Sequence, residues 1–216
     1  MRVIFQEHLD DLEQDLFTMS DMVTHAVNLS VKALKERDLD EAQRIRDNDV
    51  NINNKRWEIE ETCIKLIATQ QPVATDLREL IAVLNIITDL ERMGDYAEGI
   101  ARIVQKLGDE DPVKALIDIP RMAELSIEMI QKSLRAYSDR DDRKARLISE
   151  QDDTIDELYK QVQRELISIM IEDPKKITRC TYLLWASHNL ERIGDRATNI
   201  CERIIYLVTG EIVENI

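Results

Sequence analysis

The chain has 216 residues, with 29 Lys and Arg against 43 Asp and Glu, which gives a formal net charge of −14. Hydrophobic residues make up 44% of it and aromatic residues only 4%, with 5 Gly and 4 Pro. Because few residues favour tight turns, this composition excludes a β-sandwich or barrel and predicts a soluble all-α protein. The acidity weighs against nucleic acid or an anionic membrane as the main partner, since both attract basic surfaces.

The chain carries no feature typical of export or membrane insertion. Charges occur within the first residues before any apolar region develops, so we expect no signal peptide. The longest apolar stretch, Leu80–Ile87, is interrupted by Asn85 and is too short to span a bilayer. Cys63, Cys180 and Cys201 lie far apart, which predicts buried free thiols rather than disulfides or a zinc site. The sequence therefore predicts a cytoplasmic protein with no integral membrane segment.

Apolar residues recur three and four positions apart along most of the chain, as in helices with one buried face. Asp38, which a glutamate follows three residues later, predicts a helix start, and Pro72 predicts another. Gly108 predicts a helix end, while Ser138–Asp141 and Asp173 predict two further starts. Short connections make neighbouring helices antiparallel, as in a helical bundle. The six long helices are expected at about 3–37, 40–69, 73–107, 119–137, 141–171 and 174–208.

The two halves of the chain repeat each other. The segments Leu90–Ile100 (LERMGDYAEGI) and Leu190–Ile200 (LERIGDRATNI) agree at seven of eleven positions, at an offset of 100 residues. The middle helices align at an offset of 103, which pairs Asp49 with Asp152. The sequence therefore predicts two tandem three-helix bundles, related by an internal pseudo-two-fold repeat, over residues 1–108 and 109–216.

Each repeat carries polar or acidic residues four positions apart on its middle and last helices. Side chains at this spacing leave a helix on the same face, one turn apart. If these helices pack together, the oxygen atoms converge as a cluster that suits Mg, Ca, Mn or Fe. The predicted metal ligands are Asp49, Asn53, Glu91 and Asp95 in the first repeat and Asp152, Asp156, Glu191 and Asp195 in the second.

Two other interpretations of these residues remain open. Acids four apart often form only a solvated face, particularly in a chain this acidic. A ferritin-like bundle that binds metal or acts as a metalloenzyme is the second alternative, although the sequence lacks its Glu-x-x-His motif. Gly94 and Gly194 each cost helix stability of about 1 kcal/mol relative to alanine, which favours close packing at the repeated motif. Trp57 and Trp185 are expected in the core or between helices.

The repeated L-E-R-x-G-D-x-A-x-x-I helix, preceded by P-V-A-T-D-L-R at Pro72–Arg78, resembles the PhoU family of phosphate-signalling proteins over nearly the whole chain. The resemblance implies a non-enzymatic, cytoplasmic negative regulator of phosphate uptake and of the phosphate-starvation response. The implied partners are the ATPase subunit of a phosphate ABC transporter, a two-component sensor histidine kinase and a second copy of the chain in a homodimer. It also implies that the predicted ligands hold clusters of iron or another divalent cation.

The chain departs from the family pattern at Asn53, where a carboxylate is expected. An asparagine offers a carbonyl oxygen but no charge. We therefore expect the first repeat to bind metal more weakly than the second, and an Asn53→Asp substitution to tighten its binding.

Overall fold

A computed structural model describes the backbone of residues 2–213 and the side chains from residue 5 to 213, and this part of the chain contains no strand. The first and last residues of the predicted domains, 1 and 214–216, lie outside it. The predicted all-α architecture with six long helices is confirmed, with one further short helix and a 3-10 turn at Pro174–Lys176. The helices are α1 (Arg2–Glu36), α2 (Leu39–Gln70), α3 (Ala74–Leu107), α4 (Asp118–Asp139), α5 (Asp142–Ser149), α6 (Asp152–Glu172) and α7 (Ile177–Thr209).

Side-chain caps account for two of the predicted helix starts. The carboxylate of Asp38 accepts a hydrogen bond from the backbone N–H of Glu41 at 2.8 Å and begins α2. Asp141 accepts one from the N–H of Lys144 at 3.0 Å and begins α5. Each cap satisfies a backbone donor that the first helical turn leaves free.

Two boundaries differ from the prediction. The predicted helix 141–171 is divided into α5 and α6, because the N–H of Gln151 bonds to the carbonyl of Ile148 and tightens one turn between them. Asp173 caps the 3-10 turn, so α7 begins at Ile177 rather than near residue 174. The break between α5 and α6 leaves Asp152 as the first residue of α6.

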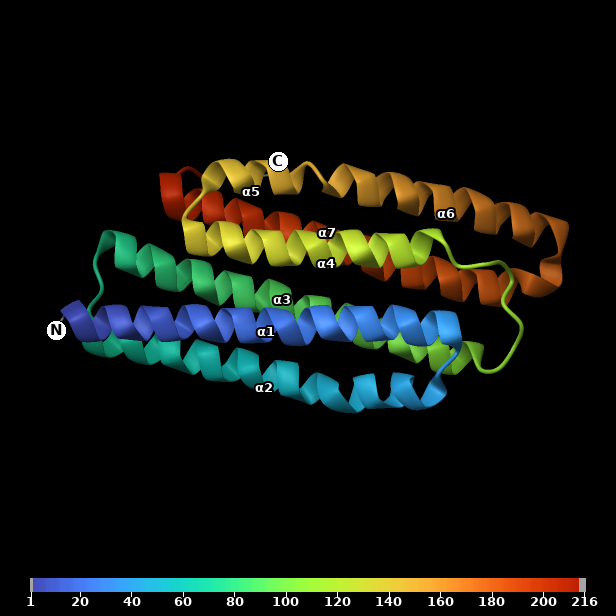
Figure 1. Cartoon of the computed structure of the whole chain (residues 1–216), viewed down its shortest axis with the longest axis horizontal. Coiled ribbons are helices and arrows are strands. Elements are labelled where there is room, and N and C mark those ends of the chain that lie inside the picture. Colours follow the sequence, from blue (N-terminus) through green and yellow to red (C-terminus); the bar gives the residue numbers. More distant parts are fainter. Residues whose placement is uncertain (1, 214–216) are drawn as a thin grey trace.

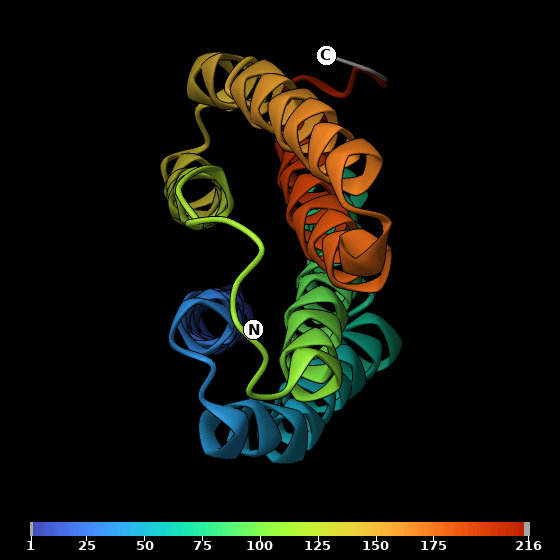
Figure 2. The same ribbon diagram turned by 90° about the vertical axis from the view of Figure 1, so that its right-hand side faces the viewer.

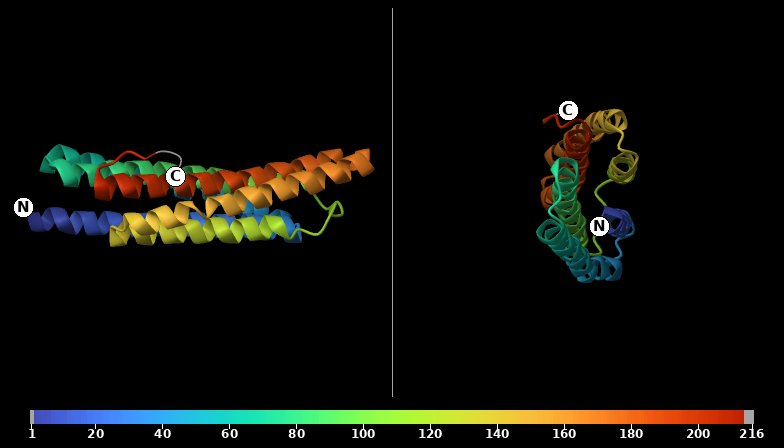
Figure 3. Two further views of the ribbon diagram at one scale, coloured as in Figure 1. Left: turned by 90° about the horizontal axis from the view of Figure 1, so that it is seen from above. Right: turned by 90° about the vertical axis from the view of Figure 1, so that its left-hand side faces the viewer.

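The helices form an elongated bundle of two layers (Figure 1 and Figure 3). Viewed along its length, α1 and α4 lie side by side in one layer and α3 and α7 in the other (Figure 2). Helix α2 covers one edge, and α5 and α6 cover the opposite edge (Figure 2). Each repeat therefore contributes an inner helix, α3 or α7, that lies between its own partners and the other repeat.

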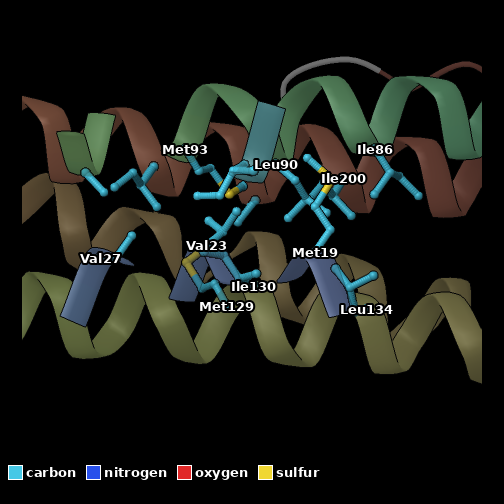
Figure 4. Packing of buried hydrophobic residues seen from close by; sticks show 14 of the residues in the cluster. Met19, Val23, Val27, Ile86, Leu90, Met93, Met129, Ile130, Leu134 and Ile200 are labelled. Carbon is cyan, nitrogen blue, oxygen red and sulfur yellow. The ribbon is translucent and has the colours of Figure 1, made fainter. Parts of the chain in front are cut away.

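One continuous hydrophobic core unites the two repeats. The predicted core positions Leu90, Met93 and Ala97 of α3 are all fully buried, as is Ile200 of α7. Figure 4 shows side chains of four helices meeting there, among them Met19, Val23, Ile86, Leu90, Met129, Leu134 and Ile200. The two bundles thus share their interior, which an extended chain of separate bundles would not do.

Reciprocal contacts between α3 and α7 express the pseudo-two-fold relation. Arg196 Nη1 lies 3.3 Å from Asp89 Oδ1, and Asn189 Nδ2 lies 3.3 Å from the carbonyl oxygen of Tyr96. Residues 89 and 189 occupy the same position of the two repeats, as do residues 96 and 196. The two inner helices therefore run antiparallel, and each presents the same stretch to the other.

The tryptophans differ from expectation, since Trp57 is 59% exposed and Trp185 is 51% exposed. The Arg56 guanidinium carbon lies 4.8 Å from the centroid of the Trp57 ring, so a cation rather than a neighbouring helix covers it. The three cysteines are fully buried free thiols, as predicted. Within residues 2–213 no helix has both the length and the hydrophobicity needed to cross a bilayer.

Candidate functional site

In the second repeat, the start of α6 packs directly on the middle of α7. The carboxylate of Asp152 occupies the space that a side chain at Gly194 would need, since a Cβ there would overlap Asp152 Oδ1. This oxygen is buried and makes no hydrogen bond of normal geometry, while the nearby side chain of Thr198 lowers the pKa of Asp152. The close packing predicted for the glycine of the repeated motif is therefore confirmed. It allows the carboxylate of Asp152 to lie directly against α7 at Gly194.

The structure brings the four predicted ligands of the second repeat together. Burial, followed by the neighbouring carboxylates of Asp195, Asp156 and Glu191, raises the pKa of Asp152 to about 7. Burial also raises the pKa of Glu191, which Asp195 raises further. Like charges at this range disfavour ionisation, and a bound cation would remove that penalty.

The second cluster has few positive groups of its own. Arg192 Nη1 lies 2.7 Å from Asp195 Oδ2 and its Nε lies 3.7 Å from Glu191 Oε2, so this arginine pairs with two of the acids. His188 Nδ1 lies 3.4 Å from the same Glu191 oxygen, which is buried and has no hydrogen-bond partner. Burial and Arg192 lower the pKa of His188, so its ring is neutral at pH 7 and could serve as a further ligand.

The donors of the second repeat fit a hard divalent cation in type. All four carboxylates supply oxygen, and two of the oxygens, one of Asp152 and one of Glu191, are buried without a hydrogen bond. Among residues 2–213, no three His, Cys, Asp or Glu side chains already stand in a metal-binding arrangement. A cation bound here would therefore have to draw the carboxylates of α6 and α7 towards each other.

In the first repeat, α2 and α3 bring the corresponding residues together less closely. A Cβ on Gly94 would lie 3.8 Å from Asp49 Oδ1 and 3.1 Å from Ile52 Cδ1, so a methyl group rather than a carboxylate rests on α3. Asn53 Nδ2 donates a hydrogen bond to Asp49 Oδ2 at 3.0 Å. Burial, and then the nearby Asp95, raises the pKa of Asp49.

The two remaining ligands predicted for the first repeat lie on the same face of α3. Burial raises the pKa of Glu91, and the neighbouring Asp95 raises it further, while Arg56 opposes the increase. The pKa of Asp95 is also raised by burial, and Arg92 opposes that increase. All four residues predicted for this repeat therefore belong to one cluster.

Three residues that the sequence analysis missed complete the first cluster. The nearly buried carboxylate of Glu98 accepts hydrogen bonds from Arg46 Nε at 2.9 Å and from Arg102 Nε at 2.6 Å. Of these three residues, Arg46 lies on α2, and Glu98 and Arg102 lie on α3. Alignment of the two repeats could have drawn attention to them, because the repeats differ in charge at these positions. Glu98 aligns with the uncharged Thr198, and Arg102 aligns with the acidic Glu202.

A cavity of about 200 Å³ lies below this cluster, between α1, α2 and α3. Asp49 and Glu98 line one side of it, and the apolar side chains of Met22, Leu29 and Ile45 line another. The isoleucines beside the two glycines approach a Cβ placed there equally closely, at 3.1 Å for Ile52 and for Ile155, so the repeats differ here in the position of the aspartate rather than in the spacing of the helices.

Comparison with known proteins identifies relatives over the whole length of the chain. The family model of the PhoU domain matches twice, over residues 16–104 and 119–204. The Phosphate-specific transport system accessory protein PhoU homolog of Clostridium acetobutylicum is 40% identical over 99% of this chain and 98% of its own length. The homolog from Pseudomonas aeruginosa is 37% identical over 98% of this chain and 88% of its own length.

Two solved structures have the same fold. The crystal structure of PhoU from Pseudomonas aeruginosa has a TM-score of 0.90 and 37% identity, covering 96% of this chain and 100% of that chain. The phosphate transport system regulatory protein PhoU from Streptococcus pneumoniae has a TM-score of 0.91 and 34% identity, covering 98% and 100%. The likeness therefore extends to both repeats.

Proposed function

Because this chain belongs to the PhoU family, as the resemblance of its repeated motif predicted, we propose that it is an accessory protein of a phosphate-specific transport system. It acts in the cytoplasm as a negative regulator of phosphate uptake and of the phosphate-starvation response. It does so without catalysis, as an adaptor between the ATPase subunit of a phosphate ABC transporter and a two-component sensor histidine kinase. The observation that carries this proposal is the full-length similarity to proteins named as accessory to phosphate transport.

The surface of the bundle supports an adaptor role. Along the outer face of α2, Val50, Trp57 and Ile64 recur every seven residues and are 54%, 59% and 55% exposed. Large apolar side chains exposed in such a row suit protein–protein contacts, with aromatic residues as anchors. The second repeat also exposes apolar side chains on its outer helices, namely Ile167, Ile171, Ile177 and Trp185. These faces are available to the transporter, to the kinase or to a second copy of the chain in a homodimer.

We propose further that the second repeat binds iron or another divalent cation such as Mn, Mg or Ca. Asp152 and Asp156 would hold it from α6, and Glu191 and Asp195 from α7. The cation would supply positive charge where burial and mutual repulsion now raise the pKa of Asp152. Its expected effect is to tie α6 to α7 and so to stiffen one edge of the bundle.

Removal of the protein from its own cells tests the regulatory proposal. Deletion should raise phosphate uptake and switch on a phosphate-starvation reporter in phosphate-replete medium, and the wild-type gene should restore both. Pull-down of the tagged chain from replete cells should recover the transporter ATPase and the kinase. Unchanged uptake and reporter activity after deletion would contradict the proposal.

The ferritin-like alternative calls for a different measurement. An oxygen-consumption assay on the iron-loaded protein should give no multiple turnover if the chain is an adaptor. Sustained turnover would instead favour a metalloenzyme. The second-repeat variant Asp152→Asn provides the control for oxidation by iron free in solution.

A further inference from the structure

The two repeats surround the same helix–helix contact with different charges. In the first repeat, four carboxylates lie among four arginines, whereas in the second, four carboxylates lie beside one arginine. The first set comprises Asp49, Glu91, Asp95 and Glu98 with Arg46, Arg56, Arg92 and Arg102. The second comprises Asp152, Asp156, Glu191 and Asp195 with Arg192. Lys160, which pairs with Glu157 at 3.0 Å, also lowers the pKa of Asp156 and adds one positive charge to the second set, as Arg56, which pairs with Glu60 at 3.2 Å, adds one to the first.

In the first repeat, arginine cations already link the two helices. Arg46 of α2 and Arg102 of α3 donate to the same oxygen of Glu98, whose side chain is only 11% exposed. Arg46 Nη1 also donates to Gln105 Oε1 of α3 at 2.6 Å. Charge-assisted hydrogen bonds to a nearly buried carboxylate are strong, and salt should screen the bond from Arg46, whose side chain is 34% exposed, less than the bond from Arg102, which is 61% exposed.

The second repeat lacks the residues for this link. At the positions of Arg46, Glu98 and Arg102 it has Ser149, Thr198 and Glu202. It also has Asp156 in place of Asn53, whose amide donates to Asp49 in the first repeat. The second repeat therefore has the same number of carboxylates, with Asp156 in place of Asn53 and Thr198 in place of Glu98, but it lacks two arginines, and its buried Asp152 oxygen makes no hydrogen bond of normal geometry.

We propose that the guanidinium groups of Arg46 and Arg102 take, in the first repeat, the place that a divalent cation takes in the second. The chain then has one metal-independent and one metal-dependent repeat. This inference rests on the proposed metal binding of the second repeat. Its physical reason is electrostatic: a divalent cation near the balanced first cluster gains no net attraction and repels the fixed guanidinium groups. The replacement of a carboxylate by Asn53 does not by itself explain why the first repeat would not bind metal. Arg46 and Arg102 would still be present in a chain with aspartate at position 53.

Binding of Mn²⁺ to the chelator-treated full-length protein tests the inference directly. In titrations followed by electron paramagnetic resonance, the wild-type chain should bind Mn²⁺ through the second repeat alone. Asp152→Asn should weaken binding at least tenfold, and the matched variant Asp49→Asn should leave it within twofold. Hydrogen exchange should slow in α6 and α7 on addition of Mn²⁺ and stay unchanged in α2. An equal loss of binding in both variants would overturn the inference.

Exchange of the residues between the repeats gives an independent test. The variant R46S/N53D/E98T/R102E gives the first repeat the residues of the second, and it should bind an additional Mn²⁺. N53D alone should add no detectable Mn²⁺ site, because Arg46 and Arg102 remain in place. The reverse variant S149R/T198E/E202R should lose Mn²⁺ binding, and circular dichroism checks that each variant is folded. If the first exchange unfolds the chain, the reverse variant decides, and unchanged Mn²⁺ binding there would contradict the inference.

Failure of the proposed metal binding would be recognised separately. In that case neither the wild-type chain nor Asp152→Asn would bind Mn²⁺. The inference would then fall together with the proposed metal binding. If instead the wild-type chain binds Mn²⁺ through the second repeat and the folded fourfold variant gains no further Mn²⁺, the metal binding stands and only the inference is overturned.

Discussion

The first and second repeats differ least in their cores and most in the charged residues around the contact between their middle and last helices. Leu90 and Leu190 occupy the same position and are both fully buried, as are Met93 and Ile193. Apolar side chains of similar volume pack equally well, so the repeated core tolerates such exchanges. The residues around the contact between the middle and last helices do not tolerate exchange in this way, because burial of a carboxylate costs free energy unless a positive group offsets its charge. One repeat meets this need with its own arginines, and we propose that the other meets it with a metal.

The ends of the inner helices α3 and α7 also differ between the repeats in which residue is charged and which is aromatic. Lys106 Nζ of α3 lies 5.7 Å from the centroid of the Tyr182 ring, and at the equivalent position of α7 the ring of Tyr206 lies 5.5 Å from the Arg78 guanidinium carbon. The cation comes from α3 and the ring from α7 in both contacts, and the partners do not align, since Tyr182 corresponds to Ala82 and Arg78 to Thr178. Both ends of the inner helices thus carry a cation–π contact, although its residues do not occupy matching positions.

Matched core truncations should have the largest effects, and they test the similar part of the comparison. Leu90→Ala and Leu190→Ala should each lower the free energy of unfolding by about 2–5 kcal/mol, because each removes a fully buried side chain from the same core. Urea unfolding followed by circular dichroism should give one transition for both variants, since the repeats share that core. Two separate transitions would contradict a shared core.

The pH dependence of stability should separate the two acidic clusters in metal-free protein. Folded Asp152 keeps its proton up to about pH 7, whereas in the unfolded chain it ionises near pH 3.8. Between these values the folded state binds more protons, so the free energy of unfolding falls as the pH rises and the loss is complete above pH 7. Asp152→Asn removes this loss and should be more stable than the wild type by about 1–2 kcal/mol at pH 7.5, a figure reduced for the solvent that reaches the group.

Urea unfolding at pH 5 and pH 7.5 in the presence of a chelator provides the measurement. The matched variant Asp49→Asn should gain less unfolding free energy at pH 7.5 than Asp152→Asn does. The reason is that Asn53 and Arg102 lower the pKa of Asp49 and so offset part of the increase that burial causes. A wild-type chain whose stability did not change between the two pH values would show that Asp152 is not held protonated.

Replacing the glycines of the repeated motif by alanine should change stability little in either repeat, and it should weaken metal binding in the second repeat only. Gly194→Ala requires Asp152 to turn away from α7, whereas Gly94→Ala meets Ile52 methyl carbons at 3.1 and 3.3 Å. In both variants the helix gains about 1 kcal/mol from alanine, and a tight contact with an isoleucine offsets much of this gain. We expect a change below about 1 kcal/mol in each, and a loss of Mn²⁺ binding of at least tenfold only in Gly194→Ala. Equal metal binding by both variants would contradict the placement of Asp152 as a ligand.

Much of the fold and the positions of the acidic residues could be predicted from the sequence, because both have periodic signals. The caps at Asp38 and Asp141 mark helix starts, and the duplicated motif marks the same site twice. The break before Asp152 could not be predicted, since residues 150 and 151 are ordinary helix formers and packing on α7 decides the local geometry. Arg46 and Arg102 were missed for a related reason: along one helix they resemble solvated surface charges, and only the packing of α2 on α3 brings them to one carboxylate.

The two exposed tryptophans should give the smallest effects on stability, and they separate folding from partner binding. Trp57→Ala and Trp185→Ala should each lower the free energy of unfolding by about 0.5 kcal/mol, because both residues are more than half exposed. The Trp57 ring contacts the guanidinium of Arg56, and the Trp185 ring contacts Lys106 and the edge of the Tyr182 ring. Residue 57 corresponds to Lys160 and residue 185 to Asn85, so neither aromatic side chain is required for the repeat to fold. If these rings contact the transporter, the kinase or a second copy, the variants should lose that partner in pull-downs or sedimentation while remaining stable. A loss of stability above about 2 kcal/mol would instead assign the rings to the core, and the two repeats would then differ in their interiors as well as in the charged residues around the contact between their middle and last helices.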